Sequence, residues 1–174
     1  MTFTEEWFGE ASQAVLAGLC ESVKYLDGAI IEVGCWEGRS TCALANAAYP
    51  EPVHAVDTWH GSPGEISADL AAVRDVHARF LANVEALTQG NVIPHRVGWR
   101  DFEWPARVKL VHIDATHEYD EVAENIAAVL PYMVPGGVIC GDDNHHPPVR
   151  QAVLDTLGAE DTFAQATLWI WRAP

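Results

Sequence analysis

Short apolar segments alternate with amphipathic segments along most of this chain, and this alternation restricts the fold more than any other feature. The runs at 29–33, 53–56, 109–113 and 138–140 have the length of buried strands, and apolar residues at helical spacing lie between them. Strands that alternate with helices form a mostly parallel sheet with helices on both faces. We therefore expect an α/β, Rossmann-like fold whose last strand, at 166–172, is antiparallel.

The remaining elements follow from the same patterns. The predicted helices cover residues 5–25, 38–48, 67–87, 116–133 and 149–157. A further strand is expected at 91–96, and a turn at 135–137. The 174 residues contain no repeat and no long linker, so one domain spanning 1–174 is expected. Within it, a helical segment at 1–28 precedes the core at 29–174.

The charge balance excludes several classes of partner. The chain has 25 acidic and 10 basic residues, a net charge of −15, which opposes binding to phosphate backbones. No apolar run approaches the ~18 residues of a membrane span. The first ten residues lack the basic region of a signal peptide. We expect a cytoplasmic protein that binds neither nucleic acid nor membranes, and we leave open an assembly of identical subunits.

Two glycines follow the first expected strand, in the sequence IIEVGCWEGRST. Gly34 would permit a tight turn, and Gly38 would let the next helix begin close to a ligand. Ser40 and Thr41 could offer hydroxyl and amide groups to a carboxylate near the start of that helix. This segment is predicted to bind a cofactor.

Acidic residues near this loop indicate which cofactor it binds. Asp57 ends the second expected strand, where a carboxylate can accept hydrogen bonds from ribose hydroxyls, and Thr58 follows it. The spacing G-x-x-x-G differs from the G-x-G-x-x-G of dinucleotide-binding folds. Glu32 would be unfavourable beside a pyrophosphate but acceptable beside an ammonium and a sulfonium. The predicted cofactor is therefore S-adenosylmethionine, with Glu32, Gly34, Gly38, Ser40, Asp57 and Thr58 as its binding residues.

The chain resembles a known family in four stretches: IIEVGCWEGRST, VHAVDTWHGSP, VKLVHIDATHEYDEVAENIAAVLPYMVPGGVICGDDN and VRQAVLD. They lie within residues 29–64 and 108–155. They are similar to class I S-adenosylmethionine-dependent methyltransferases, and specifically to the macrocin O-methyltransferase group that modifies antibiotic sugars. This resemblance implies a Rossmann-like methyltransferase that methylates a hydroxyl of a small molecule of the sugar or polyol type.

Three aspartates follow two expected parallel strands. Asp114 ends the fourth strand, while Asp142 and Asp143 end the fifth, so their carboxylates could meet. Such a group is costly without a cation, and oxygen ligands favour Mg²⁺, Mn²⁺ or Ca²⁺. The resemblance implies that these three residues bind a divalent metal, expected to be Mg²⁺, which also holds the substrate's oxygens. Alternatively, Asp142 and Asp143 are turn residues and Asp114 caps a helix.

A histidine is the expected catalytic base. His117 lies just after Asp114 and could take the proton from a substrate hydroxyl. His145 and His146 could reach the same place. Members of the resembled group often carry a second acid in the pattern D-x-D-H-x-Y, but this chain has Thr116 there, which favours His117 over an aspartate.

Three other interpretations are carried forward. The first is a non-catalytic protein of the same fold that binds the cofactor or a partner. The second is an NAD-dependent oxidoreductase, which the glycine spacing disfavours. The third is an Fe(II) oxygenase that would use His112, Asp114 and either His145 or His146, although such sites usually lie in β-barrels.

Overall fold

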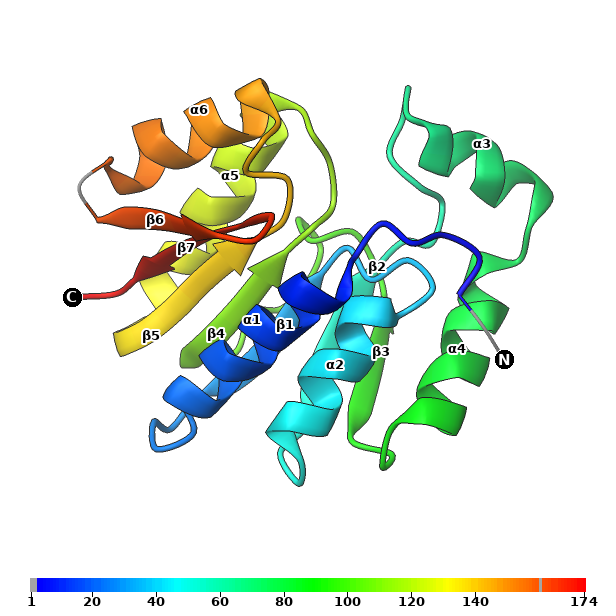
Figure 1. The fold of residues 1–174 in the computed structure, drawn as a ribbon, viewed down its shortest axis with the longest axis horizontal. Helices are drawn as coiled ribbons and strands as arrows, with labels where there is room; N and C mark the ends of the chain where they lie inside the picture. Colours follow the sequence, from blue (N-terminus) through cyan, green and yellow to red (C-terminus); the bar gives the residue numbers. More distant parts are fainter. Residues whose placement is uncertain (1–2, 160) are drawn as a thin grey trace.

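The computed structural model describes residues 3–159 and 161–174, which form one seven-stranded sheet with helices on both faces (Figure 1). The strands are β1 (Ala29–Val33), β2 (Val53–Asp57), β3 (Val92–Arg96), β4 (Val108–Ile113), β5 (Met133–Gly141), β6 (Thr162–Gln165) and β7 (Leu168–Arg172). Their order across the sheet is β3-β2-β1-β4-β5-β7-β6. Strands β1 to β5 are parallel, and β7 runs antiparallel to β5. The predicted Rossmann-like fold is confirmed.

This strand order determines where a ligand can bind. The chain moves outward from β1 through β2 to β3 and then returns to the other side of β1 as β4. The loops that follow β1 and β4 therefore separate at the carboxyl edge of the sheet, which is where open α/β sheets bind ligands. The residues that end β1, β2, β4 and β5 all lie along this edge.

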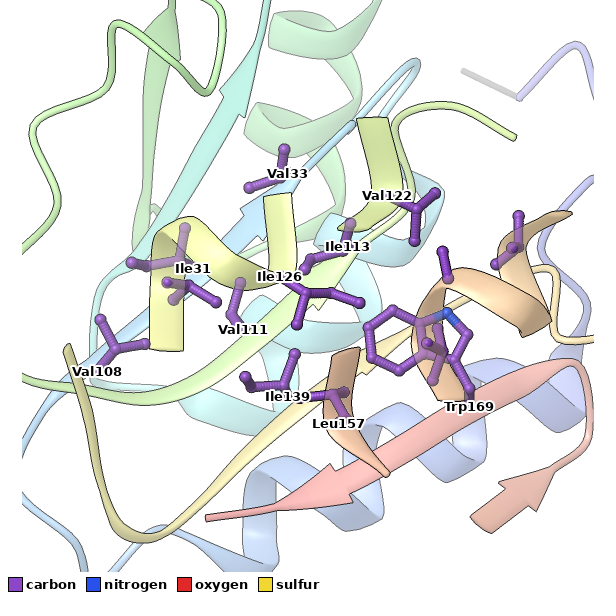
Figure 2. Close-up of a cluster of buried hydrophobic side chains, with 14 of the residues drawn as sticks. Ile31, Val33, Val108, Val111, Ile113, Val122, Ile126, Ile139, Leu157 and Trp169 are labelled. Carbon is purple, nitrogen blue, oxygen red and sulfur yellow. The ribbon is translucent and has the colours of Figure 1, made fainter. Parts of the chain in front are cut away.

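The helices divide between the two faces of the sheet. They are α1 (Glu10–Ser22), α2 (Arg39–Ala48), α3 (Ile66–Val73), α4 (Val76–Leu87), α5 (Tyr119–Val129), the 3₁₀ turn η1 (Leu130–Tyr132) and α6 (Pro147–Leu157). Helices α1, α2 and α4 cover one face, and α5 and α6 cover the other. Val122 and Ile126 of α5 pack with Leu157 of α6 against Ile139 and Trp169, forming a continuous buried layer (Figure 2).

Two predicted helices differ from the structure. The helix predicted at 5–25 begins only at Glu10, and residues 3–9 are not helical. The helix predicted at 67–87 is two helices, because Arg74 has an extended backbone and the Asp75 side chain accepts a hydrogen bond from the amide of Ala78, which starts α4. Helix α3 stands apart from the sheet and buries none of its residues.

The C-terminal half also departs from prediction. The turn expected at 135–137 lies within β5, where the pairing with β4 shifts register instead of ending. The last predicted strand is half of a hairpin, because Ala166 adopts a left-handed conformation (φ 54°) between β6 and β7. No helix in residues 3–159 or 161–174 has the length and apolar character needed to cross a membrane.

Candidate cofactor and metal site

A cavity of about 500 Å³ opens at the carboxyl edge of the sheet. The loops after β1, β2, β4 and β5 form its walls, together with residues from the N-terminal segment. Eight of the predicted site residues line it: Gly34, Ser40, Asp57, Thr58, Asp114, His117, Asp142 and Asp143. Glu32 and Gly38 do not, although both were predicted to bind the cofactor.

The two loop glycines serve different purposes. Gly34 has φ +84°, and a Cβ there would lie 2.0 Å from the carbonyl oxygen of Asp114, so only glycine fits between the β1 and β4 loops. Gly38 has φ +87° and precedes α2, but a Cβ there would lie 3.0 Å from the ring of Phe80 on α4. Gly38 thus permits close packing of α2 on α4 and does not line the cavity, whereas the sequence predicted it to lie beside a ligand.

Asp57 joins the loops that follow β1 and β2. Its Oδ2 accepts hydrogen bonds from the amides of Cys35 (2.7 Å) and Trp36 (2.9 Å), and its Oδ1 accepts one from the amide of Trp59 (2.6 Å). Burial raises the pKa of Asp57, and these amides oppose that effect. A carboxylate has about four acceptor positions, and three of those of Asp57 are occupied by backbone amides. One position is left for a ribose hydroxyl, whereas the sequence predicted hydrogen bonds from both ribose hydroxyls.

Glu32 lies beneath the cavity and is fully buried. One carboxylate oxygen accepts a hydrogen bond from the hydroxyl of Thr41 on α2, and the other accepts one from Nδ1 of His112 at 3.1 Å. Burial of His112 opposes its charged form, but the bond to Glu32 together with the charges of Glu32, Asp114 and Asp142 raises its pKa. Glu32 therefore links β1, β4 and α2, which explains why it faces the α2 side of the sheet and not the cavity.

The contact between Glu32 and His112 argues against an Fe(II) site that uses His112. His112 is fully buried and does not line the cavity that Asp114 and the later histidines share. Its ring packs edge-on against Phe8 at 5.5 Å between centroids, on the side of the sheet covered by α1 and α2. The structure thus does not bring His112 together with Asp114 and His145 or His146 as one ligand set.

The three aspartates do come together. One oxygen from each of Asp114, Asp142 and Asp143 lies within 4.8 Å of the others. Asp142 is only 7% exposed, and its Oδ1 is buried without a hydrogen-bond partner in the described chain. Burial raises the pKa of Asp114 to about 7, with the charges of Asp142 and Asp143 adding to the shift and His112 opposing it. An unpartnered buried oxygen among three close carboxylates fits a hard divalent cation.

His117 lies between two carboxylates beside this cluster. Its Nδ1 is 2.9 Å from Oε1 of Glu65, which also accepts the backbone amide of His117 at 3.1 Å. Its Nε2 is 2.7 Å from Oδ2 of Asp143. The bond to Asp143 is the main cause that raises the pKa of His117 to about 9, and a ligand that took over Asp143 would remove that cause.

Nearby histidines extend this cluster. The ring of His146 stacks on His117 with 4.6 Å between centroids, and Nε2 of His145 lies 3.9 Å from Asp143. Sequence reasoning found all three histidines but missed Glu65, since an acid in a glycine-rich loop has no signal that separates it from solvated neighbours. Glu65 lies in the loop after β2, 52 residues before His117 in the sequence, and the two side chains meet only when the chain folds.

Sequence reasoning also missed the N-terminal strap, residues 3–8, which forms one wall of the cavity. The amide and hydroxyl of Thr4 donate to Glu37 at 2.7 and 2.6 Å. Glu5 forms an ion pair with Arg74 at 2.6 Å, and Trp7 packs on Trp36 with 5.4 Å between ring centroids. The aromatic residues in this segment resembled the buried face of a helix, which explains the incorrect helix boundary.

Comparisons with known proteins bear on this site. A family model described as a methyltransferase domain matches residues 31–144, which include the glycine loop and all three aspartates. The solved structure of the O-methyltransferase NovP has a TM-score of 0.73 at 17% identity, covering 95% of this chain and 80% of that one. An apo structure of CalS11, described as a TDP-rhamnose 3′-O-methyltransferase of calicheamicin biosynthesis, has a TM-score of 0.64 at 16% identity, covering 95% of this chain and 81% of that one. A second structure of CalS11 has a TM-score of 0.74 at 15% identity.

A third solved structure contains a ligand. The N-methyltransferase NodS from Bradyrhizobium japonicum, in complex with S-adenosyl-L-homocysteine, has a TM-score of 0.59 at 13% identity, covering 97% of this chain and 90% of its own. At these identities, the likeness to all three structures shows a shared fold. A comparison with curated proteins finds no match.

Proposed function

Because this chain belongs to the methyltransferase-domain family whose model matches residues 31–144, we propose that it transfers a methyl group from S-adenosylmethionine to a hydroxyl group, assisted by a divalent cation. Membership in the family confirms the methyltransferase predicted from sequence. It also argues against an NAD-dependent oxidoreductase. The nature of the acceptor, the use of a metal and the catalytic base are the parts of this proposal that go beyond the family.

One observation carries the proposal: the carboxylate cluster and the glycine loop share a single cavity. Gly34, Ser40 and Asp57 line it on the side of β1 and β2, and Asp114, Asp142 and Asp143 line it on the side of β4 and β5. A cofactor and an acceptor held together there would react within one complex, which removes much of the entropic cost of a reaction between two molecules.

Asp114, Asp142 and Asp143 would hold the cation, and their oxygen-only ligand set suits Mg²⁺. When bound, the cation would lower the pKa of an acceptor hydroxyl and orient it, while S-adenosylmethionine would supply the methyl group. Asp142 offers the unpartnered Oδ1 for this purpose. Asp57 would accept a hydrogen bond from one ribose hydroxyl, and Thr58 lines the cavity beside it.

His117 is proposed as the general base. Glu65 accepts hydrogen bonds from Nδ1 and from the backbone amide of His117, so it fixes the orientation of the ring. A cation that bound Asp143 would take away the partner of Nε2 and leave Nε2 to take a proton. Nε2 lies beside Asp143, at the place where an acceptor hydroxyl would meet the carboxylate cluster. Nε2 would take the hydroxyl proton, while the cofactor would supply the methyl group by cleavage of its methyl–sulfur bond and leave as S-adenosylhomocysteine.

The lining of the cavity indicates the class of acceptor. Among residues 3–159 and 161–174, Arg39 is the one lysine or arginine that lines the cavity, against seven carboxylates: Glu5, Glu37, Asp57, Glu65, Asp114, Asp142 and Asp143. A diphosphate such as that of TDP-rhamnose, the substrate class in the description of CalS11, would meet repulsion there. We therefore propose a neutral hydroxylated small molecule of the sugar or polyol type, without a phosphate.

Methyl transfer from labelled S-adenosylmethionine to a panel of neutral sugars and polyols tests this proposal. We expect transfer that EDTA abolishes and Mg²⁺ restores, and that His117→Asn lowers about 100-fold. His60→Asn is the matched control, since His60 is exposed and does not line the cavity. Full activity in EDTA would remove the metal from the mechanism. Cofactor binding without transfer to any hydroxyl would favour the non-catalytic interpretation.

A further inference from the structure

His117, Asp143 and His146 form a second group of possible metal ligands beside the aspartate cluster. One nitrogen from each histidine and one carboxylate oxygen of Asp143 all lie within 4.8 Å of one another. Nε2 of His117 lies 2.7 Å from Oδ2 of Asp143, and the ring of His146 stacks on His117 with 4.6 Å between centroids. Two nitrogens and one oxygen differ from the all-oxygen set of Asp114, Asp142 and Asp143. The two groups should therefore prefer different metal ions.

The ligand atoms indicate which ion this group would take. Imidazole nitrogen suits Zn²⁺ and related transition metals, whereas Mg²⁺ prefers oxygen. Ligand atoms about 2.1 Å from a tetrahedral Zn²⁺ lie roughly 3.4 Å apart, so the three residues must approach one another slightly. His146 can make this approach because its side chain is exposed and, within residues 3–159 and 161–174, forms no capping hydrogen bond at the start of α6.

Glu65 gives an independent observation at the same place. A histidine that binds zinc usually donates its other ring N–H to a carboxylate, which orients the ring and strengthens the metal-binding nitrogen as a ligand. Oε1 of Glu65 lies 2.9 Å from Nδ1 of His117 and also accepts the backbone amide of His117 at 3.1 Å. The ring is therefore held with Nε2 toward Asp143, the orientation that a zinc ligand requires.

We propose that His117, Asp143 and His146 bind Zn²⁺ and that this ion inhibits methyl transfer. A zinc ion on Nε2 of His117 would block the nitrogen that is proposed to take the acceptor's proton. It would also occupy Asp143, one of the three residues proposed to hold Mg²⁺. The binding of zinc is independent of the proposed function, whereas its inhibitory effect rests on that function.

Titration with Zn²⁺ in excess Mg²⁺, followed by calorimetry, tests the site. We expect the wild type to bind a zinc ion whose affinity falls at least about 10-fold in His146→Asn. His145→Asn is the matched control, because His145 is the exposed neighbour of His146 and lies outside the three-ligand group. It should change the affinity by less than about twofold.

Co²⁺ serves as a spectroscopic probe of the same site, since it accepts the ligands and geometry of zinc. The wild type should give the strong visible absorption of four-coordinate Co²⁺, and His146→Asn should lose it. This readout requires neither a cofactor nor an acceptor. Absorption of equal strength in both proteins would mean that His146 is not a ligand.

Methyl transfer at fixed Mg²⁺ with increasing Zn²⁺ tests the inhibition, with each protein compared to its own zinc-free rate. The zinc concentration that halves the rate should rise at least about 10-fold in His146→Asn and stay within about twofold of the wild type in His145→Asn. Zinc that displaced Mg²⁺ from the three aspartates would instead inhibit the wild type and His146→Asn equally, and this result would overturn the proposal.

The outcomes separate the zinc site from the proposed function. Equal zinc affinity in wild type and His146→Asn would overturn the site and leave the methyltransferase proposal intact. Zinc bound through His146 without any loss of methyl transfer would overturn its inhibitory role. Zinc bound through His146 in a protein that methylates no hydroxyl would support the site and contradict the proposed function. Thermal unfolding in EDTA should match between the two proteins, since the His146 side chain is exposed.

Discussion

Two pairs of acidic side chains at the same edge of the sheet differ in what their oxygens contact. Glu32 and Asp57 have partners from the protein: a histidine and a threonine for Glu32, and three backbone amides for Asp57. Asp114 and Asp142 lie among other carboxylates, and Oδ1 of Asp142 contacts no donor in the described chain. Acids that look alike in the sequence therefore differ in whether the protein supplies partners for their oxygens.

The difference separates acids whose oxygens are bonded within the protein from acids whose oxygens face other carboxylates. The hydrogen bonds that Glu32 and Asp57 receive offset part of the cost of burying them, although burial still raises the pKa of Asp57. The three aspartates lose hydration on burial and repel one another, and both effects raise the pKa of Asp114. Such an arrangement persists in a protein when a cation stabilises it or when function requires it. Substitutions in the two groups should change stability in opposite directions.

The largest effect is expected for Asp57→Ala. This change removes the acceptor of three amide bonds that join the loops after β1 and β2, and the free energy of unfolding should fall by about 3 kcal/mol or more. Urea unfolding measures it. Asp27→Ala, whose side chain is 90% exposed, is the matched control and should change stability by less than about 0.5 kcal/mol. A loss no greater than the control's would show that Asp57 does not hold the loops.

A smaller loss is expected for Glu32→Gln. The amide side chain keeps the shape of Glu32 but weakens its bonds to His112 and Thr41, which should cost about 2 kcal/mol. The same unfolding measurement applies, with Glu85→Gln on the exposed side of α4 as control. Unchanged stability combined with weaker S-adenosylhomocysteine binding would contradict the structural role and restore the predicted contact between Glu32 and the cofactor.

The smallest expected effect is a gain in the free energy of unfolding, opposite in sign to the two losses above. Asp142→Asn removes one charge from the repelling cluster, so in EDTA the variant should be more stable than the wild type by about 1 kcal/mol. Unfolding in EDTA, with Asp27→Asn as the control for net charge, measures this gain. A loss of stability similar to that of Asp57→Ala would mean that Asp142 supports the fold as Asp57 does, and the contrast between the two groups would disappear.

Much of this site follows from sequence because parallel strands fix where their last residues lie. Asp57, Asp114 and Asp142 each end a strand or follow one, so their shared edge could be predicted from the alternation of strands and helices. The side chain of Glu32 could not be placed in this way. In a buried parallel strand both faces are apolar, and the pattern does not tell which face carries the acid toward α2.

Residues outside the regular elements escaped prediction for a related reason. Glu65 and the strap residues reach the cavity only through tertiary contacts with His117, Glu37 and Arg74, which no local pattern records. Arg39 lies inside the glycine segment that the sequence singled out, but a basic residue at a helix start gives no sign that its side chain lines the cavity.

Titration with Mn²⁺, followed by calorimetry and by the loss of the free-ion electron paramagnetic resonance signal, tests the central claim most directly. The three aspartates predict one ion per chain, with binding at least about 10-fold weaker in Asp142→Asn and unchanged in Asp27→Asn. Absence of binding by the wild type, or equal affinity in wild type and Asp142→Asn, would contradict a cation site at this edge of the sheet.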